Sequence, residues 1–321
     1  MLYLLYLPIL TFLILVYFRL AIQFKIIDKP NQRSSHSRIT IRGGGIVFPI
    51  AVLIHALVSN FQYPLFTSGL MLISFVSFYD DLRPLSNKIR LFVHLIAVSF
   101  LFSQTNLLIF PIWIVIPVYI LVIGTINAYN FMDGINGITG SYSLITILSL
   151  YFINEFSIPF VSSELLTASS LALIVFNFFN FRKKAKCFAG DVGSVSMAFI
   201  IIFFLLLLIL KTGDLKYIGL LLFYGLDTVS TIIFRLIRRE NIFEAHRSHF
   251  YQYLANVKGW PHLRVSALYM VVQLLVNLLI ILCDWNFDGF LIFILVSGIV
   301  FVGLRFVVEG RGNLIMSKLA N

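Results

Sequence analysis

Apolar runs long enough to cross a membrane recur along almost the whole chain, and they constrain its fold more than any other feature. A membrane-spanning helix needs about 20 apolar residues, because it must cross roughly 30 Å of hydrocarbon. Of the 321 residues, 60% are hydrophobic and only 12% are charged. A soluble protein carries about 25% charged residues, so we exclude a soluble fold. The candidate spans are 2–22, 44–59, 65–79, 89–102, 107–126, 138–153, 165–181, 195–210, 217–234, 265–282 and 290–308.

The loops that connect successive apolar runs alternate between two sets, one rich in Lys and Arg and the other poor in them. One set carries 19 Lys and Arg residues, whereas the other carries only Lys211 and Lys216. Because basic loops stay on the cytoplasmic side, the N-terminus is predicted outside and the C-terminus in the cytoplasm. We therefore predict an all-α integral membrane protein of about 11 transmembrane helices, with residues 1–321 forming a single domain. Contact with anionic lipid headgroups is an open alternative explanation of the basic face.

The two cysteines are predicted at opposite faces of the membrane. Cys187 lies in a basic loop and Cys283 in a loop of the other set. A disulfide tolerates a Cα separation of roughly 7 Å at most, so no disulfide is expected.

A pair of carboxylates ends the third apolar run. Asp80 and Asp81 are adjacent, and such a pair is stable only if it is hydrated, paired with a cation or bound to a metal. Taken alone, the pair is explained more simply as a solvated helix end near Arg83 and Lys88. It gains interest because other polar clusters occupy the same set of loops.

The stretch 127–137 holds the densest group of polar side chains. Asn127 and Asn130 stand three residues apart, so they share a face if the fifth helix continues, and Asp133 lies one turn further on. Asn136 follows between two glycines. A capping turn would need fewer amide and carboxylate groups than these, so we interpret the stretch as a binding site.

The eighth run opens with the sequence 190–194, Gly-Asp-Val-Gly-Ser. Asp191 and Ser194 suit a helix N-terminus whose free backbone amides face an anion. Magnesium commonly bridges a carboxylate to a phosphate, so Asp191 is a candidate magnesium ligand.

A basic loop follows the ninth run and contains His246, Arg247 and His249. Without a nearby cysteine or third histidine, zinc is not expected, whereas Arg and His donors suit phosphate or carboxylate recognition. Asp227 lies inside the ninth run, where an unpaired charge is costly. Arg235, two turns later, is its expected partner.

The remaining cluster lies before the second run. It comprises residues 28–36, with Asp28 and His36 at its ends, followed by Arg42 and three glycines. All these clusters fall in the basic loops, so the sequence predicts a site on the cytoplasmic face. Such a site suits a metal-assisted reaction between a soluble phosphorylated donor and a lipid phosphate.

At this point the chain resembles the polyprenyl-phosphate N-acetylhexosamine-1-phosphate transferases, the family of WecA, MraY and WbpL. The resemblance is closest to the O-antigen-initiating WbpL-type branch, because the histidine loop reads His-Arg-Ser-His. The matching patterns occur in family order: Asp-x-Pro-Asn-x-Arg-x-x-His at 28–36, the Asp pair at 80–81, Asn-x-x-Asn-x-x-Asp-Gly from 127, Gly-Asp-x-Gly-Ser at 190–194, Asp-Thr at 227–228 and the loop at 246–249.

The resemblance implies transfer of an N-acetylhexosamine-1-phosphate from a UDP-sugar to undecaprenyl phosphate, with release of UMP. It implies Mg²⁺ or Mn²⁺ held by Asp191 and Asn130. It makes Asp80, Asp81 and Asp191 the catalytic residues, with Asp80 as a base or as the group that orients the acceptor. The substrate-binding residues that we carry over are Asn127, Asn130, Asp133, Asn136, His246, Arg247, His249, Asp227 and His36.

The resemblance further implies a multi-pass protein of the bacterial cytoplasmic (inner) membrane that initiates surface-polysaccharide synthesis. The expected partners are the UDP-sugar, undecaprenyl phosphate and the lipid bilayer, with no nucleic acid; a homodimer is left open. The competing interpretation is a transporter or flippase for a lipid-linked or anionic substrate. Transporters place binding groups near the bilayer midplane, whereas here only Asp227 is a candidate deep charge.

Overall fold

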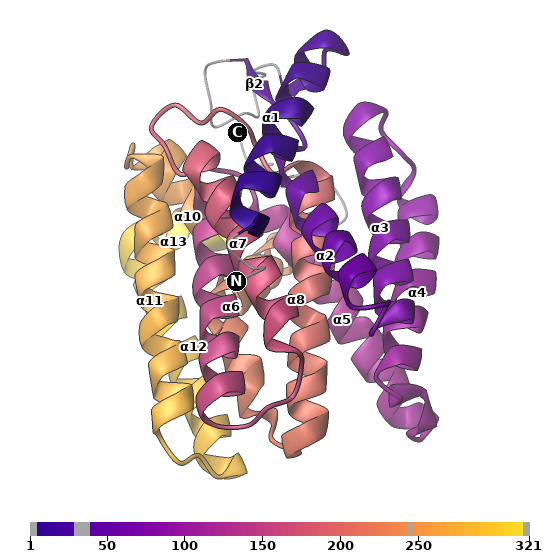
Figure 1. Ribbon diagram of the computed structural model, residues 1–321. Coiled ribbons are helices and arrows are strands. Elements are labelled where there is room, and N and C mark those ends of the chain that lie inside the picture. The colour runs from indigo at the N-terminus through magenta and orange to yellow at the C-terminus, as the bar shows by residue number, and fades with distance from the viewer. Residues whose placement is uncertain (1–4, 29–38, 243–245, 317–321) are drawn as a thin grey trace.

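The protein is a bundle of long helices with one small strand pair at one end (Figure 1). The computed structural model describes residues 5–28, 39–242 and 246–316. Its α-helices are α1 (Tyr6–Gln23), α2 (Val47–Val58), α3 (Pro64–Leu82), α4 (Asn87–Gln104), α5 (Ile112–Met132), α6 (Ile138–Phe156), α7 (Ser163–Asn180), α8 (Gly190–Thr212), α9 (Leu222–Ile237), α10 (Phe250–Gln252), α11 (His262–Leu282), α12 (Phe287–Glu309) and α13 (Arg311–Ile315). The shorter helical segments are η2 (Gly44–Ile46), η3 (Leu107–Ile109), η4 (Leu215–Leu221) and η5 (Tyr253–Val257).

Where the structure describes the chain, every predicted apolar run coincides with helical structure, which confirms the all-α membrane class. Within the described residues, eight helices are long and apolar enough to cross a membrane. The Gly44–Val58 helix is shorter than a span, and α4 and α6 are not among these eight. The count of eleven spans and the outside N-terminus therefore stay predictions.

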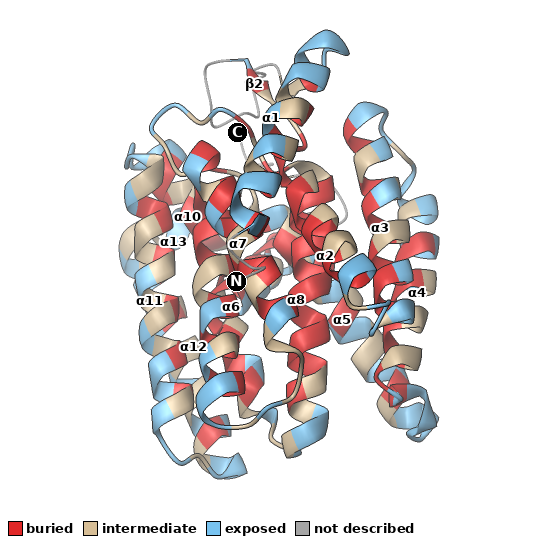
Figure 2. Cartoon of the chain, viewed as in Figure 1, coloured by how far each residue is buried: buried red, intermediate tan, exposed pale blue. Residues whose placement is uncertain are grey.

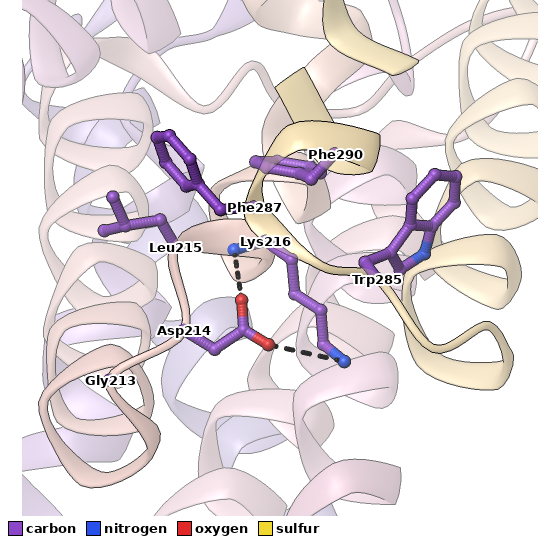
Figure 3. Close-up of a pocket in the computed structure, with 7 residues that line it drawn as sticks. All are labelled: Gly213, Asp214, Leu215, Lys216, Trp285, Phe287 and Phe290. Carbon is purple, nitrogen blue, oxygen red and sulfur yellow. Dashed lines mark hydrogen bonds and ion pairs between the residues drawn. The ribbon is translucent and has the colours of Figure 1, made fainter. Parts of the chain in front are cut away.

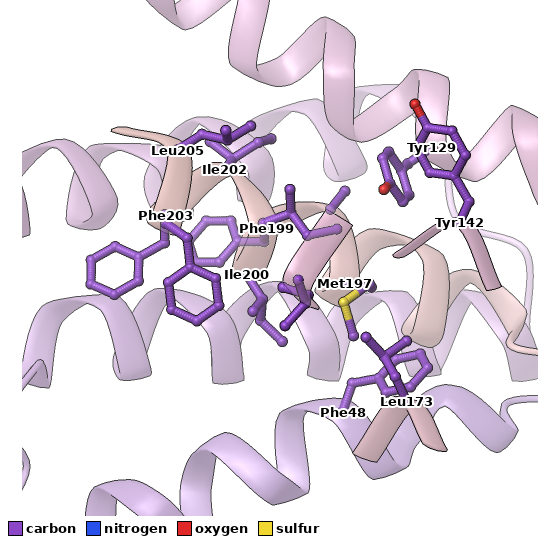
Figure 4. Close-up of a cluster of buried hydrophobic side chains, with 14 of the residues drawn as sticks. Phe48, Tyr129, Tyr142, Leu173, Met197, Phe199, Ile200, Ile202, Phe203 and Leu205 are labelled. Atoms are coloured by element: carbon purple, nitrogen blue, oxygen red, sulfur yellow. The ribbon is translucent and has the colours of Figure 1, made fainter. Parts of the chain in front are cut away.

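Helix α8 forms the centre of the bundle. In its most apolar stretch 89% of the residues are buried, compared with 11% in α12 at the periphery. Its side chains pack on several neighbours (Figure 4); Phe203, for example, stacks on Phe66 of α3 with ring centroids 3.9 Å apart. Figure 2 shows the buried residues concentrated along the inner helices and the exposed ones along the outer faces. The exposed outer side chains include many large apolar residues, which suits contact with lipid.

A break in the ninth apolar run is stabilised by polar side chains inside the bundle. The run divides into η4 and α9, and Gln273 of α11 bridges the two parts. Its Oε1 accepts from the Phe223 N–H at 2.9 Å, and its Nε2 donates to the Gly219 carbonyl at 3.0 Å. The Tyr142 hydroxyl donates to the same Oε1 at 2.6 Å. Backbone groups without hydrogen-bond partners are costly in hydrocarbon. Gln273 supplies such partners on both sides of the break, which explains how the helix can break there.

The strand pair is the one feature that the all-α prediction omitted. Strands β1 (Ile27–Asp28) and β2 (Thr40–Ile41) pair antiparallel. Ile41 also bridges to Cys187 in the segment before α8, and the Phe188 N–H donates to the Ile41 carbonyl at 2.8 Å. The segment after α1 is thereby attached to the start of the central helix.

Candidate functional site

Asp81, at the end of α3, caps the first turn of α8 from outside that helix. Its Oδ1 accepts from the Asp191 N–H at 2.9 Å and its Oδ2 from the Val192 N–H at 3.0 Å. Gly190 permits this approach, because its φ is +71° and an added Cβ would lie 2.6 Å from Asp81 Oδ2. We predicted that the free amides of this helix start would face a bound anion. In the structure, the anion that they bind is the protein's own Asp81.

Two arginines lie among three carboxylates, which we call the acidic cluster: Asp80, Asp81 and Asp191. Arg42 Nε donates to Asp81 at 2.6 Å, and Arg90 Nη1 donates to Asp80 at 3.1 Å. The same guanidinium groups stand 3.6 and 3.9 Å from Asp191. Burial opposes the charged form of Arg42, but the carboxylates of Asp81 and Asp191 outweigh it and raise the guanidinium pKa. Three carboxyl groups thus face two guanidinium groups, so a further cation would reduce the repulsion among the carboxylates.

Of the two asparagines predicted on one face of α5, the structure brings one to the start of α8. Asn130 Oδ1 accepts from the Ser194 hydroxyl of α8 at 2.8 Å. Asn127 is exposed, and its side chain donates to the Ile123 carbonyl of its own helix at 3.0 Å. Asn130 therefore lies at the start of α8, whereas the hydrogen bond of Asn127 stays within α5.

The loop after α5 holds Asp133 and Asn136. Burial raises the pKa of Asp133 to about 6; Asp81 adds to this shift, whereas Arg42 opposes it. The Asn136 amide donates to the Arg182 carbonyl at 2.9 Å. Asn136 thus ties its loop to the segment before α8, while Asp133 keeps a carboxylate that titrates near neutral pH.

Asp227, deep in α9, is fully buried and caps a second helix. It accepts from the N–H groups of Phe250 and Tyr251 at 2.8 and 3.3 Å, which form the start of α10. The Tyr269 hydroxyl of α11 donates to it at 2.7 Å. These hydrogen bonds anchor the start of α10. Asp227 therefore holds this segment in place and is not open to solvent.

The predicted partner of Asp227 is wrong. Arg235 hydrogen-bonds to Glu240 at 3.0 Å and to nearby backbone carbonyls instead. The guanidinium near Asp227 belongs to Arg305 of α12, whose Nη1 lies 3.9 Å from it. Arg305 also donates to the Ser248 carbonyl at 2.8 Å. The last long helix therefore holds the same segment that Asp227 caps.

The histidine segment, residues 246–249, lies over this anchor. His249 is buried with its Nδ1 3.5 Å from Asp227 Oδ1, and its ring centroid lies 4.9 Å from that of His246. Burial, with His249 and neighbouring arginines, lowers the pKa of His246 to about 3. His246 is therefore neutral near pH 7 and offers a donor without a charge. Arg247 is exposed and keeps the positive charge of the segment.

One hydrogen bond joins α10, which directly follows the histidine segment, to the end of α5. The Tyr251 hydroxyl donates to the Phe131 carbonyl at 2.9 Å. The end of α5 therefore contacts both the start of α8, through Asn130, and α10, through Phe131. His36 lies in the stretch 29–38, outside the described residues.

Several residues of this region had no role in the sequence interpretation. Arg90 and Arg305 are charges inside predicted apolar runs, which is a signal that could have identified both. Arg42 was noted only as the residue before three glycines. Tyr269 carries no such signal, because tyrosine is common in membrane helices.

The donors at the start of α8 fit a magnesium or manganese ion by their chemistry. The Asp191 side chain is 21% exposed, and its nearest guanidinium groups stand beyond hydrogen-bond distance. The Asn130 amide oxygen adds a second hard donor, since a carbonyl oxygen has two lone pairs and Ser194 uses one. In the described part of the chain no three His, Cys, Asp or Glu side chains converge as metal ligands. Magnesium commonly takes one or two carboxylates and completes its shell with phosphate and water.

A hollow at the other end of α8 is separate from this site (Figure 3). It is lined by Gly213, Asp214, Leu215, Lys216, Trp285, Phe287 and Phe290. Asp214 accepts from the Lys216 N–H at 2.9 Å and pairs with its ammonium group at 3.5 Å. Of the two basic residues at this end of α8, Lys211 and Lys216, the ion pair gives Lys216 an acidic partner.

Comparison with known proteins points to one family. Residues 63–209 match the model of glycosyl transferase family 4. The predicted family resemblance is confirmed. A Bacillus subtilis protein named probable undecaprenyl-phosphate N-acetylglucosaminyl 1-phosphate transferase is 26% identical over 79% of this chain and 76% of its own length. Proteins named undecaprenyl-phosphate alpha-N-acetylglucosaminyl 1-phosphate transferase are 29% identical in Yersinia pestis, over 59% of this chain and 57% of theirs, and 29% in Thermotoga maritima, over 75% and 77%.

These relatives and the eight span-length helices make the chain a multi-pass protein of the bacterial inner membrane. The segment that matches the family model contains the whole acidic cluster and the 127–137 stretch. Arg42, Asp227 and the histidine segment lie outside it.

Proposed function

We propose that the protein transfers an N-acetylhexosamine-1-phosphate from a UDP-sugar to undecaprenyl phosphate. The observation that carries this proposal is the position of Asp191, at the start of a membrane helix between the half-exposed guanidinium groups of Arg42 and Arg90. Carboxylates with arginines suit a phosphate that arrives with a divalent cation. The printed names of the relatives support the same acceptor and the same class of transferred group.

In the proposed reaction, an oxygen of the lipid phosphate forms a bond to the β-phosphorus of the UDP-sugar. The bond between that phosphorus and the bridging oxygen breaks, and UMP leaves with the electron pair. The products are UMP and a lipid diphosphate sugar. The lipid phosphate is already ionised near neutral pH, so it needs orientation more than deprotonation.

The residues of the site have separate roles in this proposal. Asp80, which Arg90 and the Leu85 N–H hold in place, orients the acceptor. Asp81 keeps the start of α8 and Arg42 in position. Asp191 and Asn130 would hold Mg²⁺ or Mn²⁺, which would neutralise charge on the phosphates.

The donor is assigned to the other side of the site. Asp133 would accept a hydrogen bond from the uridine part, with Asn136 shaping that loop. Arg247 would bind the sugar diphosphate, because an exposed guanidinium offers a planar fork of donors. His246 would add an uncharged contact, and His249 would add a second ring beside it. We further propose that the product starts O-antigen or another surface polysaccharide.

The transporter alternative has one observation in its favour, the broken helix between η4 and α9. Broken helices often line substrate sites in transporters. Here Gln273 satisfies the backbone groups on both sides of the break, which supports a structural role for it. Uptake of a lipid-linked sugar into sealed vesicles that hold the protein would be the sign of transport.

The decisive experiment is turnover by the purified protein in lipid nanodiscs. The protein would receive undecaprenyl phosphate, Mg²⁺ and a panel of UDP-sugars, and UMP release would be measured with the lipid product. We expect UMP only when acceptor and donor are both present. If no UDP-sugar yields a lipid diphosphate sugar, the proposed function is wrong.

A further inference from the structure

Arg42 is a charged residue of the site to which the sequence interpretation assigns no role. It precedes three glycines and lies outside the segment that matches the family model. Its position follows from backbone packing. Gly44 and Gly45 donate their N–H groups to the Phe188 and Ala189 carbonyls at 2.8 and 3.1 Å. These bonds hold the segment against the start of α8.

The glycines are needed for that close approach. An added Cβ on Gly45 would lie 2.3 Å from the Gly193 Cα, and one on Gly44 would lie 2.5 Å from the Cys187 Sγ. The Tyr17 hydroxyl donates to the Arg42 carbonyl at 2.6 Å. Backbone contacts on both sides therefore place this arginine at the acidic cluster.

The Arg42 guanidinium is held at one nitrogen and open at the others. Nε donates to Asp81 at 2.6 Å, and among the described residues Nη1 and Nη2 make no hydrogen bond. Nη2 stands 3.6 Å from Asp191, and the side chain is 36% exposed. By contrast, Arg90 uses both its terminal nitrogens, on Asp80 and Asn87. Arg42 thus presents unused donors beside the carboxylate that is the candidate metal ligand.

Charge neutralisation alone would not require an arginine at position 42. Asp81 already accepts two backbone N–H groups, and a lysine could supply the same positive charge. A guanidinium with one nitrogen fixed keeps its remaining donors in one plane, which matches the oxygens of a phosphate group. An ammonium group has no such fork.

We propose that Arg42 binds a phosphate oxygen of a reacting substrate through its free terminal nitrogens, while its bond to Asp81 fixes the guanidinium. This inference rests on the proposed function. The phosphate belongs either to the UDP-sugar or to the lipid acceptor, since both bring phosphate to Asp191. Arg42 is on this basis a specificity-determining residue for phosphate at the reaction centre.

The first test compares Arg42→Lys and Arg42→Gln with Arg83→Lys, a change of an exposed arginine just beyond the acidic cluster. Initial rates are measured with each substrate varied in turn. Arg42→Lys should lower kcat/KM roughly 10- to 100-fold, and Arg83→Lys should leave it unchanged. A loss confined to the UDP-sugar parameters assigns the phosphate to the donor, and a loss confined to the lipid parameters assigns it to the acceptor. Wild-type kinetics in Arg42→Lys, with a loss only in Arg42→Gln, would reduce Arg42 to charge neutralisation and overturn the proposal.

A second test uses the unmodified protein, in case the variants do not fold. Phenylglyoxal modifies exposed arginines, and mass spectrometry measures its addition at Arg42 and Arg83. With Mg²⁺ present, either UDP-N-acetylglucosamine or undecaprenyl phosphate should protect Arg42 but not Arg83. Absence of protection by both substrates, in a protein that turns them over, overturns the inference alone. A wild-type protein without turnover defeats the proposed function instead, so the two failures are distinguishable.

Discussion

Replacement of Asp81 by Asn should destabilise the protein far more than the same replacement at Asp191, although the two carboxylates are neighbours. Asp81 accepts hydrogen bonds from Arg42, Asp191 and Val192 at 2.6, 2.9 and 3.0 Å. An asparagine keeps one of the two oxygens, and its NH₂ group would face a donor. The lost charge-assisted bonds cost about 2–4 kcal/mol, discounted because Arg42 is partly exposed. This corresponds to a fall in Tm of roughly 5–10 °C.

Asp191→Asn removes no comparable contact. The guanidinium groups of Arg42 and Arg90 stand 3.6 and 3.9 Å from its carboxylate, and a neutral side chain relieves repulsion within the acidic cluster. We expect a stability change within about 0.5 kcal/mol. Turnover should nevertheless fall by roughly 100-fold or more, because an amide is a poor ligand for a hard cation.

The assay can use a thiol of the protein itself. Cys187 is fully buried beside the start of α8, whereas Cys283 is exposed. In a Cys283→Ser background, a thiol-reactive fluorescent dye reports unfolding around Cys187 as the temperature rises. Turnover at limiting and at saturating Mg²⁺ is measured on the same samples.

The two variants should differ clearly. Asp81→Asn should lower the temperature at which Cys187 reacts, and Asp191→Asn should abolish turnover at an unchanged temperature. If Asp81→Asn leaves the temperature at which Cys187 reacts unchanged, the cap does not rest on Asp81. If Asp191→Asn keeps near-normal turnover at limiting Mg²⁺, its role as a metal ligand is refuted.

Four further predictions follow from the same contacts. Burial raises the pKa of Asp133 to about 6 from 3.8, so kcat/KM for the UDP-sugar should fall as pH drops below about 6. The same shift makes the folded state lose stability as pH rises from about 4 to 6, so Asp133→Asn should raise Tm at pH 7 and remove the kinetic step; a wild-type pH profile in this variant would contradict the assignment. Arg247→Lys should lower kcat/KM for the UDP-sugar about 30- to 1000-fold, whereas a rise only in the KM of the lipid phosphate would mean that Arg247 contacts headgroups. Arg305→Lys should speed proteolysis at Arg247, because Arg305 holds the neighbouring Ser248 carbonyl at 2.8 Å; an unchanged rate would show that this contact does not anchor the segment. Cys283 should react with a membrane-impermeant thiol reagent in intact cells, and reaction only in opened cells would reverse the predicted orientation.

The positions of the helices could be predicted because hydrocarbon leaves a chain few choices. Backbone groups inside a membrane must be bonded within the segment, so a charge-poor run such as 195–210 is helical whatever surrounds it. The break between η4 and α9 could not be predicted, because it depends on Gln273, which lies some 50 residues further along the chain. The strand pair was also missed, since two-residue strands leave no periodicity.

The chemistry of the candidate site could be predicted from the sequence, because carboxylates, amides and histidines are costly near a membrane and their clusters stand out. The sequence did not indicate which of these side chains face a substrate. Asp81 and Asp191 have the same side chain in different surroundings. Both oxygens of Asp81 accept hydrogen bonds from the backbone of α8, whereas the Asp191 side chain is partly exposed. Asp227 likewise pairs with Arg305 and not with Arg235, which is nearer in the sequence. Sequence spacing limits which side chains share a helix face, but the partner of a buried charge depends on which helices pack together, and that is a property of the tertiary structure.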